Sequence, residues 1–302
     1  MILEKTLPLI VIFIIGFLLK KAGVLKKEYG DPLATLVIWI VAPAVIAGSL
    51  AKTELAAGLM SLPLIAVLAV SSLLAIGWLA AKAICLTGKT RGAWIITFPT
   101  LEGGTVGYAV MLAVFGTLGL SRIVLFDFGN ALFEFTAIYL LAAALGNREG
   151  ERESFGKLLW KTLTTPLVLA IPVGLGLNLF HVESPLLWNV LDTAGAGLIT
   201  LVMLMVALEF EPKISSFKLP ITMLALQVPA SIFVAWFWTS VFGLAGIERT
   251  ATFVGICLPT SIMGLVFAKE NKLDAEFAAN VIALGLPFSL VFLPILIHFL
   301  TK

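Results

Sequence analysis

Hydrophobic and polar residues follow one another along this chain in long blocks. Apolar runs of about 20 residues, the length that a helix needs to cross a bilayer core, are separated by short charged islands. Lipid cannot satisfy the backbone groups of an open sheet, so each run is predicted to be a helix. The ten predicted spans cover residues 4–20, 33–51, 61–82, 92–115, 121–146, 161–180, 187–209, 219–243, 250–268 and 277–299.

The composition supports an all-α polytopic membrane protein. Hydrophobic residues make up 60% of the 302 residues and charged residues only 13%, about half the share that is typical of soluble domains. The net charge of +2 is too small to indicate a nucleic-acid partner. Cys85 and Cys257 lie in or beside apolar runs, so we expect small buried hydrophobic residues rather than a disulfide or a zinc site.

The distribution of Lys and Arg predicts the orientation of the chain. With the N-terminus outside, fifteen of the twenty basic residues fall in or at the edge of cytoplasmic loops, and none is expected in the interior of a span. Cytoplasmic loops of membrane proteins carry such an excess of basic residues. We therefore expect a multi-pass protein of the cell membrane with both termini on the extracytoplasmic side.

The charged loop at residues 147–156 divides the chain into two halves of five spans each, residues 1–150 and 151–302. If two halves with an odd number of spans are related, they have opposite orientations in the membrane. This 5+5 inverted repeat is the arrangement of many secondary transporters.

A short motif recurs in the fourth span of each half. It reads P-T-x-x-x-G and begins at Pro99 in the first half and at Pro259 in the second. Proline and glycine in membrane helices are often simple kinks or packing notches, but their matching positions favour interrupted helices. Unwound backbone at this depth is tolerated where it lines a cavity. The predicted substrate-binding residues are Thr100, Glu102, Gly103, Gly104, Thr105, Pro259, Thr260 and Ser261.

Acidic and amide side chains lie within two predicted spans. Glu102 lies in the interrupted segment, and Asp127, Asn130 and Glu134 share one face of the fifth span. A carboxyl group without a basic partner in the membrane is protonated, bound to a cation or reached by water. We predict Glu102, Asn130 and Glu134 as ion-coupling residues. The alternatives are a protonated, structural Glu102, a Glu134 that only satisfies a neighbouring helix, and a hydrated Asp127 near its span end. Gln227 is expected to form a hydrogen bond between helices.

Several short segments resemble the auxin efflux carrier family of permeases, and their order along the chain gives the resemblance its specificity. They are Leu7–Ile10, Gly16–Lys21, Val41–Ala44, Ser49–Lys52, Phe98–Gly116, Val124–Asp127, Leu258–Thr260, Phe267–Glu270 and Pro294.

The resemblance implies a 5+5 fold shared with bile acid–sodium symporters. In that fold, broken helices 4 and 9 cross in a transport domain that slides like an elevator against a scaffold domain, and each domain is built from both repeats. It implies a secondary active transporter of small organic solutes, most often organic anions. Where the family usually has Asn in N-x-G-x-x-G-x-P, this chain has Glu102, and Ala109 takes the proline position. An anionic side chain at this position would repel an anionic substrate. The alternative is therefore a carrier that is coupled to a cation or a proton and takes a neutral or cationic substrate.

No enzyme activity, catalytic residue, metal site or cofactor is expected, apart from Na⁺ or H⁺ as a coupling ion. The expected partners are a small-molecule substrate, the lipid bilayer and, as one option, a second copy in a homodimer. A cation channel would also place acids in the membrane, and a receptor or scaffold would use them for packing. The paired breaks and the inverted symmetry favour the carrier.

The predicted orientation can be tested by labelling. In a background lacking Cys85 and Cys257, a single cysteine replacing Gly150 should react with a membrane-impermeant maleimide only from the cytoplasmic side, because the basic residues there favour that side. A cysteine replacing Glu183, in an opposite loop, is the matched control. Labelling of the Gly150 position from outside would contradict the orientation.

Overall fold

The computed structural model describes residues 2–53, 57–146, 154–210 and 217–301, and all regular structure in these parts is helical, without a strand. Most of the charged loop predicted at 147–156 lies outside the described residues. The first half of the chain contains α1 (Ile2–Lys21), η1 (Lys27–Tyr29), α2 (Gly30–Leu36), η2 (Val37–Val41), α3 (Ala42–Ala51), η3 (Ala57–Ser61), α4 (Leu62–Ala83), α5 (Gly88–Thr97), η4 (Gly103–Gly107), α6 (Tyr108–Phe133), η5 (Glu134–Ile138) and α7 (Tyr139–Leu145).

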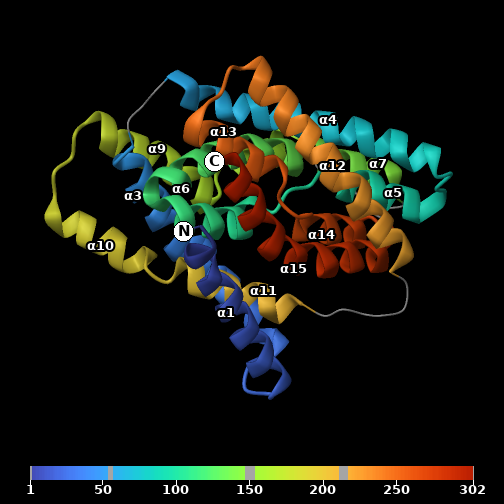
Figure 1. Cartoon of the computed structure of the whole chain (residues 1–302), viewed down its shortest axis with the longest axis horizontal. Coiled ribbons are helices and arrows are strands. Elements are labelled where there is room, and N and C mark those ends of the chain that lie inside the picture. Colours follow the sequence, from blue (N-terminus) through green and yellow to red (C-terminus); the bar gives the residue numbers. More distant parts are fainter. Residues whose placement is uncertain (1, 54–56, 147–153, 211–216, 302) are drawn as a thin grey trace.

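The second half follows the same all-helical plan, with long helices separated by short breaks (Figure 1). It contains α8 (Phe155–Leu163), α9 (Pro166–Leu179), α10 (Pro185–Gly195), α11 (Leu198–Glu209), α12 (Lys218–Val241), α13 (Gly246–Ile256), α14 (Ile262–Glu270) and α15 (Ala275–Leu300).

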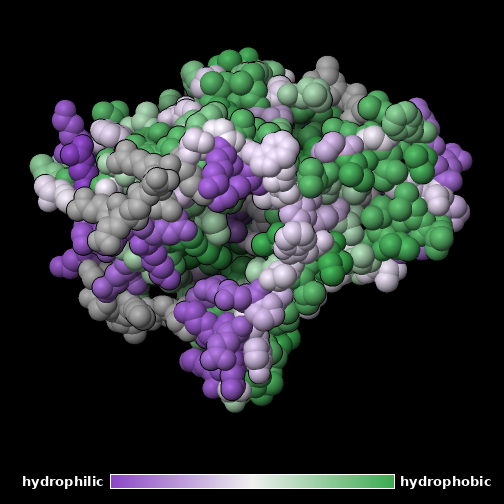
Figure 2. All heavy atoms as spheres, turned by 180° about the vertical axis from the view of Figure 1, so that it is seen from behind, coloured by the Kyte–Doolittle hydropathy of each residue, from purple (hydrophilic) through white to green (hydrophobic). Residues whose placement is uncertain are grey.

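Six helical stretches are long and apolar enough to cross a membrane, and a seventh results if α8 and α9, which are bent by 56° at their junction, form one span. The chain is therefore a polytopic membrane protein. Large hydrophobic side chains lie exposed on the outside of these helices, among them Trp39, Phe180 and Phe233. Figure 2 shows hydrophobic surface over much of the upper and right parts of one face, while hydrophilic side chains lie on the lower projection, on the left side and at the right edge. Lipid would cover the hydrophobic part.

The longest apolar stretch, Gly103–Leu145, is interrupted at Gly116. Gly116 has φ 63° and ψ −152°, which is outside the helical region and is readily adopted only by glycine. The interruption coincides with the boundary predicted between the spans 92–115 and 121–146.

Two other predicted spans are not continuous helices. The span predicted at 161–180 is broken between α8 and α9, and the one predicted at 187–209 is broken between α10 and α11. Pro166 explains the first break, because proline lacks a backbone donor and fits best at the start of a helix. In the second, Gly195 and Gly197 flank the junction, and Gly195 packs directly against Val45.

The helices pack in two sets. In one set α1 lies against α11, and α3 lies against α9 and α10. In the other, α4 packs against α6 and α12, while α12 also contacts α13 and α15. Contacts of α1 and α3 with α6, and of α11 with η4, join the two sets. The start of η4, which follows the interrupted segment after α5, therefore lies where the second set meets the first.

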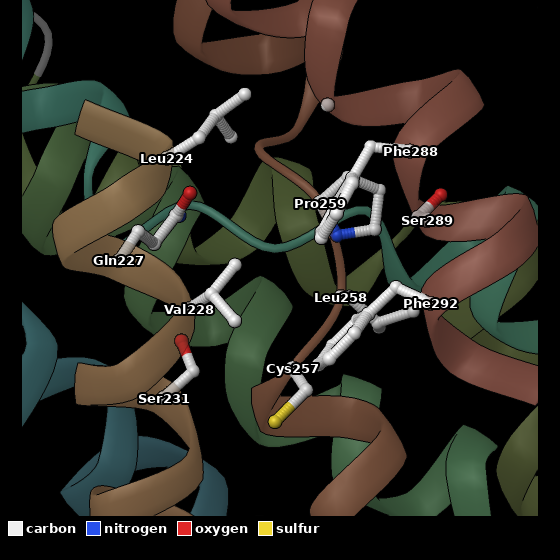
Figure 3. A pocket seen from close by; sticks show the side chains of 11 residues that line it. Leu224, Gln227, Val228, Ser231, Cys257, Leu258, Pro259, Phe288, Ser289 and Phe292 are labelled. Carbon is white, nitrogen blue, oxygen red and sulfur yellow. The ribbon is translucent and has the colours of Figure 1, made fainter. Parts of the chain in front are cut away.

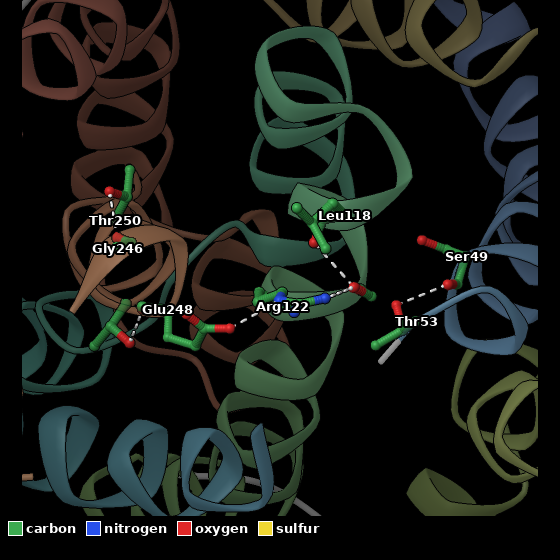
Figure 4. A network of polar contacts seen from close by, with 9 residues as sticks. Ser49, Thr53, Leu118, Arg122, Gly246, Glu248 and Thr250 are labelled. Atoms are coloured by element: carbon green, nitrogen blue, oxygen red, sulfur yellow. Dashed lines mark hydrogen bonds and ion pairs between the residues drawn. The ribbon is translucent and has the colours of Figure 1, made fainter. Parts of the chain in front are cut away.

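Arg122 differs from the expectation that basic residues lie outside the spans. It lies within α6, is buried, and forms an ion pair with Glu248 of α13 in which Nε is 3.1 Å from Oε1 (Figure 4). Its Nη1 also donates to the Ser121 hydroxyl. A nearby α3 hydroxyl, that of Ser49, donates to the carbonyl of Thr117 at 2.6 Å. The partner carboxylate on α13 is what allows a cation to be buried here.

The buried ion pair should contribute more to stability than an exposed one. Glu248→Gln should lower the free energy of unfolding by about 2–4 kcal/mol, because Arg122 would stay buried without a charged partner. Asp192→Asn removes an ion pair to Lys52 whose side chains are 43% and 64% exposed, and should cost less than about 1 kcal/mol. Denaturant titration in micelles gives both values. Equal losses of unfolding free energy in the two variants would show that burial does not strengthen the Arg122–Glu248 ion pair.

Candidate functional site

The two interrupted segments cross and bond to each other through their backbones. The amide of Glu102 donates to the carbonyl of Pro259 at 2.9 Å, and the amide of Ser261 donates to the carbonyl of Thr100 at 3.3 Å. Each segment therefore satisfies polar groups that the other has lost by leaving the helical conformation. The predicted meeting of Thr100, Thr260 and Ser261 is confirmed, although their roles in binding stay predictions.

Gln227 of α12 ties the crossing to a third helix. Its amide donates to the carbonyl of Phe98 at 2.8 Å and to the Thr260 hydroxyl at 3.4 Å. Figure 3 shows Gln227 on α12 opposite the segment that carries Pro259. The interhelical hydrogen bond expected for Gln227 is confirmed, and it contacts both interrupted segments at once.

The carboxylate of Glu102 joins the two segments through its side chain. Its Oε2 accepts from the amide of Ile262 at 2.8 Å, and its Oε1 accepts from the Thr105 hydroxyl at 2.5 Å. Ile262 is the first residue of α14, so the negative charge lies at the positive end of that helix. Glu102 is 7% exposed and each of its oxygens has a donor. It is therefore part of the crossing itself.

Asp127 belongs to the crossing as well, and the expectation that it is hydrated near its span end was wrong. It is buried and accepts hydrogen bonds from the Tyr108 hydroxyl at 3.0 Å and the Asn130 amide at 2.9 Å. A Cβ on Gly103 would lie 1.8 Å from Asp127 Oδ1. The carboxyl group therefore packs directly on the glycine that begins η4, the second half-helix N-terminus of the site.

Glu134 is the third buried carboxyl group, on the first residue of η5. Ser261 and Asn130 lie beside it, and Glu102 and Asp127 are close enough to act on it electrostatically. Its Oε1 has no hydrogen-bond partner within the described residues. The three carboxyl groups come from the broken segment, α6 and η5, and the described part of the chain shows no ion pair between them and a basic side chain.

A metal site is not indicated. No group of three or more His, Cys, Asp or Glu side chains in the described parts of the chain is arranged to hold a metal ion. The donor sets at Glu102 and Asp127 consist of hydroxyl, amide and backbone N–H groups, which satisfy a carboxylate or a carboxylic acid without a metal.

A cavity with about 310 Å³ of empty space, part of it open, lies against the second interrupted segment. Its walls come from α12, from residues 257–259 and from α15, and they are mostly apolar (Figure 3). Gln227, Ser231 and Ser289 are its polar lining residues. Ser231 and Ser289 were not predicted as site residues, and the available signal was weak: single hydroxyl groups within apolar runs.

The remaining predicted site residues surround the crossing. Gly104 and Thr105 are partly exposed on η4, which contacts α11 of the other set of helices. Gly103 and Pro259 are buried, and Pro259 also lines the cavity. The structure thus brings all predicted substrate-binding residues to one place, with its exposed part at Gly104 and Thr105.

A helical membrane protein with two crossing interrupted helices and a buried polar centre has the features of a transporter, and comparison with known proteins agrees. The Membrane transport protein family matches residues 1–297, so the chain belongs to this auxin efflux carrier-like family. An uncharacterized transporter of Methanothermobacter thermautotrophicus is 26% identical over 299 residues, 97% of this chain and 96% of its own. One from Methanocaldococcus jannaschii is 26% identical over 302 residues, 96% of each chain. The protein is a membrane transporter.

The packing of Asp127 on Gly103 gives a sharp test of the crossing. Gly103→Ala should prevent or severely destabilise folding, because the new Cβ overlaps Oδ1 of a buried carboxyl group, and each oxygen of that group is held by one donor. At Gly104 the nearest atom to a Cβ is 3.9 Å away, so Gly104→Ala should be tolerated. Size-exclusion profiles and melting temperatures in detergent compare the two. Equal behaviour of both variants would contradict the packing described.

Proposed function

We propose that this transporter is a secondary active carrier that binds a small organic solute at the crossing of its two interrupted helices. The observation that supports it is the pair of reciprocal backbone bonds between the segments at Thr100–Glu102 and Pro259–Ser261. In secondary carriers, discontinuous helices of this kind form the substrate site near the middle of the membrane.

The proposed architecture is ten spans in a 5+5 inverted repeat, with halves at residues 1–150 and 151–302. Three features support it: the interruption at Gly116, the matching positions of the two crossing segments, and the separation of the helices into two packed sets. The set around α1, α3, α9 and α11 is proposed as the scaffold. The set around α4, α6 and α12 to α15 is proposed as a transport domain that moves past it in an elevator-type cycle.

The charge around the crossing favours a neutral or cationic solute over the organic anion that the family resemblance implies. The N-terminus of a helix attracts anions, and an interrupted pair offers two such ends. Here Glu102 accepts a bond from the first amide of α14, and Asp127 packs on the first residue of η4. The chain's own carboxyl groups thus occupy both places that would suit an anionic solute.

Location and coupling belong to the same proposal. We place the protein in the cell membrane, in contact with lipid, with both termini outside and with Glu102, Asn130 and Glu134 as candidate coupling residues. A solute that enters between the two sets of helices would first meet Gly104 and Thr105, the exposed part of the site.

A solute screen followed by counterflow tests this function. Purified protein is first screened by thermal shift against amines, neutral polyols and carboxylic acids at several pH values, and each hit is then tested for saturable counterflow in proteoliposomes. Amines or neutral solutes should stabilise the protein. Glu102→Gln should weaken binding of a cationic hit about tenfold, or about 1.4 kcal/mol, because it removes the charge but keeps a carbonyl acceptor for Ile262.

Glu183→Gln, the same substitution at an exposed position, is the matched control and should bind like the wild type. Counterflow is a property of carriers that channels, receptors and scaffolds lack. If only carboxylic acids stabilise the protein and show counterflow, the proposed charge preference is reversed. If no hit shows counterflow, the proposal that the protein is a carrier is wrong.

A further inference from the structure

The side-chain amide of Asn130 has a fixed orientation. Its nitrogen donates to the carbonyl of Leu101 at 3.1 Å and to Asp127 Oδ1 at 2.9 Å, which uses both of its hydrogens. The opposite orientation would place the amide oxygen against two acceptors, so it is excluded. The remaining atom, Oδ1, is therefore an acceptor, and it is buried without a donor in the described part of the protein.

A second buried acceptor without a donor lies one helical turn away, on Glu134. The backbone amide of Glu134 donates to the carbonyl of Asn130, so the two side chains stand one helical turn apart on the same face. Glu134 is 3% exposed, and its Oε1 has no partner among the described residues. Two neighbouring buried acceptors cost free energy unless a donor lies between them.

The surroundings of Glu134 supply negative charge and no buried positive charge. Glu102 and Asp127 both act on it from the crossing. On α8, which packs against η5, Lys157 and Lys161 are exposed. Ser261, from the second interrupted segment, faces the carboxyl group but also accepts from the Met263 amide.

Three further charged groups lie farther along the neighbouring helices. Lys269 and Glu270 of α14 are exposed. Arg122 of α6, the buried cation on the helix that leads to η5, is already paired with Glu248.

We propose that Glu134 is a proton-binding site, in which a proton on Oε1 is donated in a hydrogen bond to Asn130 Oδ1. The ionised carboxylate takes the proton from a hydronium ion, an O–H bond forms at Oε1, and water leaves; release is the reverse. One proton then satisfies both unpartnered acceptors and removes one of three neighbouring negative charges. Ser261 lies beside Glu134 and is also the residue that precedes α14 in the crossing. Protonation of Glu134 would therefore change the electrostatic environment of the second interrupted segment.

The site itself does not depend on the proposed transport cycle; only its role as the coupling site for a carried solute rests on that function. If it has that role, binding of a proton on one side of the membrane and release on the other would drive the solute. The tests below therefore measure protonation in purified protein without solute, and their outcome is independent of the counterflow assay.

Infrared difference spectroscopy detects the proton directly, because a carboxylic acid has a C=O stretching band that a carboxylate lacks. At neutral pH the wild type should show such a band, Glu134→Gln should lose it, and Glu183→Gln should keep it, since Glu183 is exposed. If wild type and Glu134→Gln give the same band, Glu134 is ionised and the proposal is wrong.

Unfolding as a function of pH is the second test. A folded state that holds one more proton than the unfolded chain loses stability as the pH rises, and its unfolding equilibrium constant grows about tenfold per pH unit. Glu134→Gln should lose this dependence, because its amide group donates permanently to Asn130 Oδ1. Glu134→Leu should also lose it but be less stable than Glu134→Gln, because leucine leaves that oxygen without a donor.

A comparison of stability with and without Na⁺ distinguishes a bound proton from a bound sodium ion. Replacing NaCl with choline chloride at fixed pH and ionic strength should leave the stability of the wild type unchanged. Stabilisation by Na⁺ in the wild type but not in Glu134→Gln would overturn the proposal and assign the two oxygens to a sodium ion. Equal pH dependence in wild type and Glu134→Gln would overturn it as well.

Discussion

The rest of the structure depends on how two interrupted helices satisfy their backbone in a membrane. Lipid cannot replace the hydrogen bonds lost between α5 and η4 or between α13 and α14. The two segments replace them for each other, through the bonds of Glu102 to Pro259 and of Ser261 to Thr100. Gln227 then fixes the pair to α12. The site exists because each break makes the other tolerable.

The same crossing explains how acidic side chains can be buried without basic partners. Glu102 lies at the end of α14 and receives a backbone and a hydroxyl donor, while Asp127 is held by Tyr108 and Asn130. These hydrogen bonds satisfy both carboxyl groups, which makes Glu102 and Asp127 structural parts of the crossing. Glu134 has no such full set of donors, and an incompletely satisfied group in a buried network is where a ligand or proton has most effect.

Much of this arrangement was predictable, because the bilayer imposes a simple pattern on sequence. Apolar runs predicted the helices, the P-T-x-x-x-G motifs predicted the interrupted segments, and Gln227 was expected to bond between helices. The predictions failed where a single partner from a distant segment decides the outcome. Arg122 is buried because Glu248 is next to it. Cys85, expected to be buried, failed for a local reason: it lies in the turn after α4 and is exposed.

The sequence by itself determined the helical class, the positions of the two crossing breaks and the membrane transport family, because each depends on local composition or on motif order. Only the tertiary structure decided that Glu102 joins the two segments, that Asp127 packs on Gly103, and which carboxyl oxygen lacks a donor. All three carboxyl groups look alike in an apolar run. Their differences arise from hydrogen-bond donors that the fold brings from elsewhere in the chain, and no local pattern encodes which acceptor each donor will reach.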